Sequence, residues 1–182
     1  AEAMDSGQTR YVPGKGTPAL QKSIQSKFLN DNNLHYDLDE IIVGVGGKHI
    51  IYNAMMATIN PNDEVIIPAP FWVSYPDIVL LAEGKPVIVQ CPESQNFKIT
   101  ADQLEKNITD KTKWLMLNSP SNPTGSLYSK QELKQLAEVL LEYPNVLVMS
   151  DDIYEKVIYD NLEFETIASV EPKLKDRCLT LN

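Results

Sequence analysis

The sequence predicts an α/β protein: a mainly parallel sheet with helices on both faces, in a three-layer αβα arrangement. Short apolar segments alternate along the chain with helical segments that carry capping residues and apolar side chains at helical spacing. The apolar segments lack polar alternation, which is typical of strands covered on both faces. The 182 residues can form one core of ordinary size. No linker or repeat divides them, so a single domain is predicted.

The helix boundaries rest on capping signals. Thr17 is a good N-cap and is followed by Pro18 at the first helical position, which predicts a helix to about Asn30. Thr100 and Ser129 are each followed three residues later by Gln or Glu, the capping-box pattern. Helices are also predicted over 48–59 and 72–82. The predicted strands are 40–45, 64–68, 86–90, 113–117, 146–150 and 177–181.

Composition excludes several classes of protein. The net charge is −9 and no basic stripe stands out, which argues against a nucleic-acid or anionic-membrane partner. No apolar run is long enough to span a membrane and no leader pattern opens the chain. Cys91 and Cys178 form neither a metal motif nor a disulfide framework. A soluble cytoplasmic protein is therefore expected.

Ligands of open parallel sheets bind past the carboxyl ends of the strands, so the segments at those ends hold the candidate site. Gly46 and Gly47 lie between a predicted strand and a predicted helix, followed by Lys48. Bare backbone and free amide groups at a helix start suit a phosphate. The pattern matches neither the P-loop nor the dinucleotide fingerprint. A glycine turn without a ligand is the alternative.

An aromatic side chain and a polar loop follow two other strands. Trp72 comes shortly after one strand and can stack on a flat ring, although a core aromatic cluster is the alternative. The loop 118–125 holds two X-Pro bonds that would fix Asn122 as a hydrogen-bond donor. A plain connecting loop is the alternative there.

A carboxylate ends the strand 146–150. Asp151 would be costly to desolvate there without a cationic partner, and no Arg lies nearby in the sequence. A ligand cation is an attractive partner, and Tyr154 could face the same site; a solvated Asp is the alternative. Together, a phosphate cradle, a stacking aromatic, amide and phenol donors and a carboxylate fit pyridoxal 5′-phosphate, whose pyridinium nitrogen characteristically pairs with a carboxylate.

Five segments resemble the class I/II aminotransferases of pyridoxal-phosphate fold type I, and most of all bacterial aspartate aminotransferases, some of which accept prephenate. They read YVPGKG at 11–16, VGGK at 45–48, PFWVSYP at 70–76, NSPSNPTG at 118–125 and SDDIYE at 150–155. The match is ordered and covers nearly the whole chain. Asp152 stands where the family usually has Glu, a conservative change.

This resemblance implies a role for each candidate residue in a homodimeric enzyme. The cofactor phosphate would be bound by Gly46, Gly47 and Lys48, and Trp72 would stack on the ring. Asn122 and Tyr154 would contact the 3-oxygen of the ring, and Asp151 would pair with its nitrogen. Tyr11 would reach the phosphate bound by the neighbouring subunit. The implied reaction moves an amino group between an amino acid such as aspartate and a 2-oxo acid such as 2-oxoglutarate. No metal is implied.

The resemblance also implies that part of the enzyme is absent. The family's Schiff-base lysine is expected beyond Asn182, and neither Lys48 nor Lys113 is a good substitute. The 182 residues are then expected to be the central part of the large domain, without the N-terminal arm and the small domain, and inactive alone. The alternatives are another fold-type I enzyme (a C–S lyase or an aminocyclopropane-carboxylate synthase) and a non-catalytic pyridoxal-phosphate-binding module.

Overall fold

The structure, a computed structural model, describes residues 1–182 and divides them into two compact units, Ala1–Val45 and Gly46–Asn182. The single domain expected from the sequence stays a prediction. The two units are described separately below. That both are parts of the large domain of a longer protein stays a prediction.

The first unit is helical. It contains α1 (Glu2–Asp5), α2 (Pro18–Asn32) and the 3-10 helix η1 (Leu38–Glu40). The predicted cap of α2 is confirmed, because the Thr17 hydroxyl accepts a hydrogen bond from the Leu20 amide at 3.3 Å. The buried side chain of Gln21 donates to the carbonyls of Leu38 and Ile41 at 2.9 and 2.8 Å. These bonds tie α2 to the segment that follows it.

The predicted strand over 40–45 is wrong. Residues 41–45 follow η1 without pairing in a sheet, and the Val43 amide donates to the Lys15 carbonyl at 3.1 Å. The side chains of Ile42 and Val45 are 60% and 90% exposed. An apolar run forms a strand only where a neighbouring strand satisfies its backbone groups, and the run itself does not reveal that neighbour.

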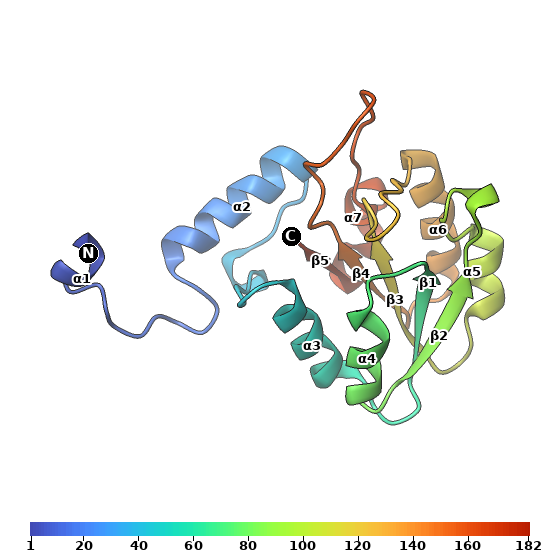
Figure 1. Cartoon of the computed structure of the whole chain (residues 1–182), viewed down its shortest axis with the longest axis horizontal. Helices are drawn as coiled ribbons and strands as arrows, with labels where there is room; N and C mark the ends of the chain where they lie inside the picture. Colours follow the sequence, from blue (N-terminus) through green and yellow to red (C-terminus); the bar gives the residue numbers. More distant parts are fainter. The chain divides into compact units, whose positions relative to one another are not determined.

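The second unit is built on a five-stranded sheet of order β2-β1-β3-β4-β5, in which every neighbouring pair is parallel (Figure 1). The strands are β1 (Glu64–Ala69), β2 (Lys85–Gln90), β3 (Thr112–Asn118), β4 (Leu147–Asp151) and β5 (Cys178–Leu181). The helices are α3 (Gly47–Thr58), α4 (Ser74–Leu81), α5 (Ala101–Asn107), α6 (Lys130–Glu142), α7 (Ile167–Val170) and the 3-10 helices η2 (Glu93–Gln95) and η3 (Pro172–Arg177). The other five predicted strands and the predicted parallel sheet are confirmed.

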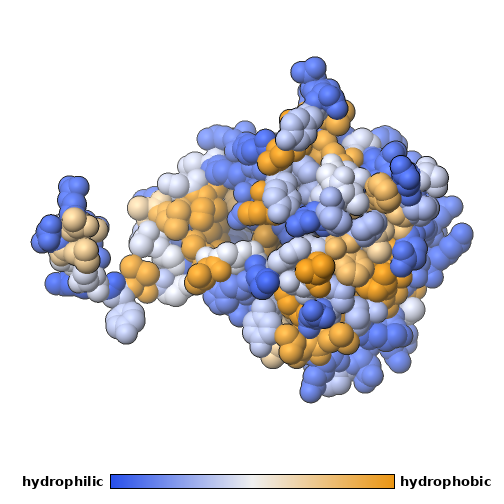
Figure 2. Space-filling model, in the orientation of Figure 1, coloured by the Kyte–Doolittle hydropathy of each residue, from blue (hydrophilic) through white to orange (hydrophobic).

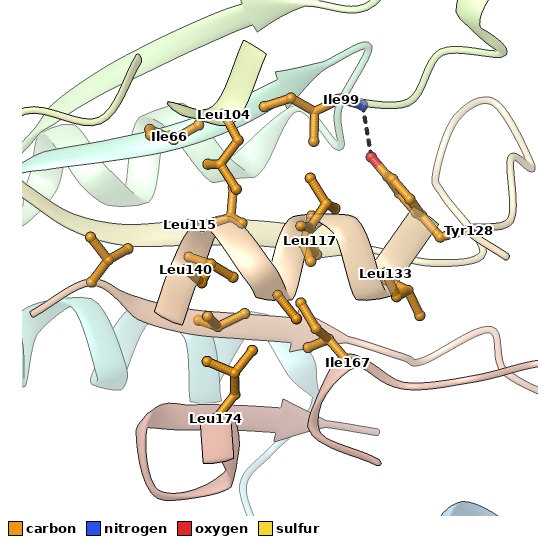
Figure 3. Packing of buried hydrophobic residues seen from close by; sticks show 14 of the residues in the cluster. Ile66, Ile99, Leu104, Leu115, Leu117, Tyr128, Leu133, Leu140, Ile167 and Leu174 are labelled. Atoms are coloured by element: carbon orange, nitrogen blue, oxygen red, sulfur yellow. Dashed lines mark hydrogen bonds between the residues drawn. The ribbon is translucent and has the colours of Figure 1, made fainter. Parts of the chain in front are cut away.

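Successive residues of the strands supply two hydrophobic layers on opposite faces of the sheet. Ile67 and Met116 pack with residues of α3 and α4, such as Met55. Ile66 and Leu115 pack on the other face with residues of α5, α6, α7 and η3 (Figure 3). Both faces are therefore covered, which explains the continuously apolar strands and confirms the three-layer arrangement.

Two capping boxes and one buried phenol stabilise α5, α6 and the segments that lead into them. The side chains of Thr100 and Ser129 cap α5 and α6 as predicted, and in return each N-cap amide donates to the side chain of the third helical residue, Gln103 or Glu132. The buried hydroxyl of Tyr128 accepts a hydrogen bond from the Ile99 amide at 2.9 Å (Figure 3). An amide this deep would otherwise lose its water without a replacement partner.

The surface of the second unit also carries hydrophobic side chains. Tyr52 and Met56 on α3 and Leu80 and Leu81 on α4 are 39% to 66% exposed. Hydrophobic atoms are visible over this region in Figure 2. No helix has the length and apolar character needed to cross a membrane.

Candidate active site

A cavity of about 290 Å³ opens at the carboxyl ends of β1, β3 and β4 in the second unit. The chain passes from β1 to β2 on one side and returns to β3 on the other, so the strand order reverses here, where ligands of open α/β sheets bind. The cavity is lined by Gly46, Gly47, Lys48, Ile51, Trp72, Tyr75, Asn118, Asn122, Asp151, Ile153, Tyr154 and Leu181. Every site residue predicted within this unit lies in that lining.

The start of α3 forms one wall of the cavity. Gly46 is the N-cap with a φ of 85°, a conformation that favours glycine, and no side chain caps the helix. A Cβ on Gly47 would lie 3.3 Å from Leu181 Cδ2, so a larger residue would crowd β5. The first amide groups of a helix lack carbonyl partners within it, so this wall can bind an anion.

The carboxylate of Asp151 lies at the end of β4 and is 6% exposed. The Tyr75 hydroxyl donates to its Oδ2 atom at 2.5 Å, and the Ile153 amide donates to its Oδ1 atom at 3.4 Å. Burial raises the pKa of Asp151 above its ordinary value, and the bond from Tyr75 opposes that shift. Neither donor carries a positive charge, so a cationic ligand group would stabilise this carboxylate.

Two aromatic side chains border the same space. The half-buried ring of Trp72 meets Tyr75 edge to face, with centroids 5.4 Å apart and planes at 85°. The Lys48 ammonium lies 5.0 Å from the Trp72 ring centroid. Tyr154 is 38% exposed and lines the cavity three residues after Asp151. A flat ring placed here could stack on Trp72 while a phenol hydroxyl contacts its edge.

Asn118 and Tyr75 line the cavity although the sequence analysis did not single them out. Asn118 pairs with Asp151 in the β3–β4 register, and its side chain contacts both Asp151 and Asn122. Tyr75 follows Trp72 by three residues in a segment that the sequence predicts to be helical, which was a usable signal. The contact between Tyr75 and Asp151 joins positions 76 residues apart and has no local signature.

Asp152, the neighbour of Asp151, does not line the cavity. It is 1% exposed, accepts a hydrogen bond from the Ser150 hydroxyl at 2.7 Å on Oδ1, and has no hydrogen-bond partner on Oδ2. Burial raises the pKa of Asp152 to about 7. Two adjacent carboxyl groups thus have different surroundings: one faces the cavity, and the other is enclosed by protein.

Tyr11 belongs to the first unit, where its side chain is fully exposed. Its predicted contact with a neighbouring subunit stays a prediction. The segment that carries it, 7–16, has no regular helix or strand, as its Pro and Gly content indicated.

Sequence comparison shows which family the chain belongs to. The profile of the family described as aminotransferase class I and II matches residues 1–182, the whole chain. The chain belongs to this family. The predicted family and the predicted α/β fold are thus confirmed.

Individual relatives point to a narrower group. The chain is 57% identical over 181 residues to a probable aspartate/prephenate aminotransferase of Rickettsia bellii, covering 100% of this chain and 45% of the relative. It is 50% identical over 182 residues to an aspartate aminotransferase of Rhizobium meliloti, covering 100% of this chain and 44% of that protein. The chain therefore spans a little under half the length of these relatives.

Solved structures agree. The aspartate aminotransferase from Rhizobium meliloti superposes with a TM-score of 0.96 at 51% identity, covering 98% of this chain and 45% of that one. The aspartate aminotransferase from Thermus thermophilus, solved with maleate, gives a TM-score of 0.92 at 37% identity, covering 98% and 46%. The backbone of this aminotransferase-family chain is thus very similar to that of known enzymes.

Proposed function

We propose that this chain is the cofactor-binding part of a pyridoxal 5′-phosphate-dependent aminotransferase. The whole protein would move the amino group of an amino acid such as aspartate to a 2-oxo acid such as 2-oxoglutarate. The observation that carries the proposal is the buried Asp151 carboxylate, which faces a cavity and receives hydrogen bonds only from uncharged donors among its described contacts. A protonated pyridine nitrogen is the cation that would complete this environment.

The other lining residues suit the remaining parts of the cofactor. The amide groups at Gly46, Gly47 and Lys48 would bind the phosphate at the start of α3. Trp72 would cover one face of the ring, and Asn122 and Tyr154 would donate to its 3-oxygen. When bound, the protonated ring supplies an electron-withdrawing group that stabilises negative charge on the substrate.

Lysine placement limits what this part of the protein does by itself. Lys48 is the lysine that lines the cavity, and it projects from the helix start that would bind the phosphate. We therefore propose that the Schiff-base lysine lies beyond Asn182 and that the 182-residue chain alone does not transaminate. The names of the relatives favour aspartate over the substrates of other fold-type I enzymes. A cytoplasmic location stays a prediction of the sequence.

Titration of the whole protein with pyridoxal phosphate tests this function. Saturable binding with a change in cofactor absorbance is expected, together with oxaloacetate formation from aspartate and 2-oxoglutarate. Pyridoxal without its phosphate is the matched ligand, and it should bind roughly 2- to 30-fold more weakly if the α3 terminus contributes as helix ends generally do. Absence of cofactor binding, or turnover by the 182-residue chain alone, would contradict the proposal.

We also propose that the whole protein is a homodimer. The exposed hydrophobic side chains on α3 and α4 and the fully exposed Tyr11 ring are surfaces that a second subunit could cover. Light scattering of the purified whole protein should give twice the mass of one polypeptide at micromolar concentration. A monomer under those conditions would contradict this proposal.

A further inference from the structure

We propose that Asn118 is a positioning residue that holds two cofactor contacts, Asp151 and Asn122, at a fixed separation. This inference rests on the proposed function and assigns a role to a residue that would not itself carry the chemistry. Asn118 is the last residue of β3, and Asp151, the last residue of β4, is its partner in the sheet register.

Both ends of the Asn118 amide are used. Its Nδ2 atom donates to the backbone carbonyl of Asp151 at 2.8 Å, and its Oδ1 atom accepts from the backbone amide of Asn122 at 2.7 Å. The two partners require opposite ends of the side chain, because one is an acceptor and the other a donor. Rotating the amide by 180° would place donor against donor and acceptor against acceptor, so a single orientation satisfies both bonds.

The position of Asn122 depends on this link. The loop after β3 closes on itself, because the Ser121 amide donates to the Ser126 carbonyl at 2.9 Å and the Gly125 amide donates to the Ser121 carbonyl at 2.7 Å. Those bonds shape the loop but do not join it to β4. The Ser119 amide joins the start of the loop to β4 by donating to the Asp151 carbonyl at 3.3 Å. The Asn118 side chain bonds to that same carbonyl and also to Asn122, so it ties Asn122 itself to β4. The side chains of Asn122 and Asp151 can then meet one ring with a fixed spacing, which functional sites need to a fraction of an ångström.

A double-mutant cycle on cofactor affinity tests the proposal in the whole protein. Asn118→Ala and Asn122→Ala should each weaken pyridoxal phosphate binding by roughly 5- to 100-fold, the range expected for losing one or two hydrogen bonds. The loss in the double variant should be smaller than the sum of the two single losses, since Asn118 acts in part through Asn122. Asn107→Ala is the matched control: it removes an amide that donates to the Gln103 carbonyl at 2.8 Å outside the cavity, and it should leave affinity unchanged.

A second variant and a cofactor-free measurement cover the possibility that Asn118→Ala does not fold. Asn118→Asp keeps an acceptor for the Asn122 amide but places a carboxylate oxygen against the Asp151 carbonyl, so its affinity should also fall. Without cofactor, hydrogen exchange of the Asn122 amide should be faster in Asn118→Ala than in the unaltered protein, because its acceptor is gone. In the loaded protein, the pH dependence of the cofactor absorbance should shift in both Asn118 variants and not in Asn107→Ala.

The outcomes separate the two proposals. If the unaltered protein binds no pyridoxal phosphate, the proposed function fails, and this inference fails with it. If the unaltered protein binds the cofactor and both Asn118 variants bind it equally well, only the role of Asn118 is overturned. Losses of affinity that add fully in the double variant would also overturn it, because Asn118 would then not act through Asn122.

Discussion

Replacing Asp151 with Ala is expected to weaken pyridoxal phosphate binding by about 10²- to 10⁴-fold and nearly to abolish turnover in the whole protein. Removing one partner of a buried charge pair costs about 3–5 kcal/mol, since the remaining charge is left without its counterion. Asp151 is 6% exposed, so water cannot easily take its place. The loss should fall on rate as well as affinity, because the proposed role of the carboxylate is to keep the ring nitrogen protonated.

Asp151→Asn separates the charge from the shape. The amide can still accept the hydrogen bond from Tyr75, so the cavity should keep its geometry while losing its negative charge. Asp151→Asn is expected to lose most of the cofactor affinity and turnover that Asp151→Ala loses. The exposed Asp176 lies outside the cavity lining, and Asp176→Ala is the control for a general effect of one fewer acid. Near-normal kcat and cofactor affinity in Asp151→Asn would remove Asp151 from its proposed role.

Asp152→Asn is expected to raise the free energy of unfolding at pH 8 and to change it little at pH 4. Asp152 is enclosed, with no partner on Oδ2, and burial raises its pKa to about 7 from the ordinary 3.8. The negative charges of Asp151 and Glu155 add to the shift, and hydrogen bonds from Thr166 and Ser150 oppose it. The amide is neutral at every pH, so it avoids the cost of ionising inside the protein.

The direction with pH follows from proton linkage. Between pH 4 and pH 7 the folded state retains a proton on Asp152 that the unfolded state has released, so the stabilising effect of that proton is present below pH 4 and is lost as pH rises to 7. Three pKa units correspond to ~4 kcal/mol, which is the upper size of the effect. Well above pH 7, Asp152 is ionised in both states, so its effect on the free energy of unfolding no longer changes with pH.

Urea unfolding at pH 4, 6 and 8 measures this effect as a difference between the unaltered protein and Asp152→Asn. Taking the difference removes the pH dependence of Asp151, whose pKa is also raised by burial and which both proteins retain. Asp176→Asn serves as the matched exposed control and should show no pH-dependent difference. An Asp152→Asn protein that is destabilised equally at all three pH values would show that Asp152 is not protonated in the folded state near neutral pH.

Much of the second unit could be predicted because its signals are local. Capping boxes at Thr100 and Ser129 locate helix starts through residues only three positions apart, and the apolar runs become strands where a sheet is available to cover them. The rule that ligands bind at the carboxyl ends of parallel strands then predicts that Trp72 and Asp151 belong to one site. The cavity contains both residues.

The remainder depends on contacts between distant positions. The segment 40–45 has the composition of a strand, yet no strand lies beside it. The hydrogen bond from Tyr75 to Asp151 and the two hydrogen bonds of the Asn118 side chain arise from sheet register and helix placement. No window of neighbouring residues encodes these contacts. The raised pKa of Asp152 has the same origin, since its enclosure depends on residues such as Thr166 from a later loop.

The strand order has a consequence for how the polypeptide can be assembled during synthesis. After β2, the chain crosses back so that β3 joins the free edge of β1, and β4 and β5 then each join the outer edge beside the strand that precedes them in the chain. No strand has to be inserted between two that are already paired. The pairing of Asn118 with Asp151 at the cavity therefore needs β3 and β4 alone and does not wait for β5.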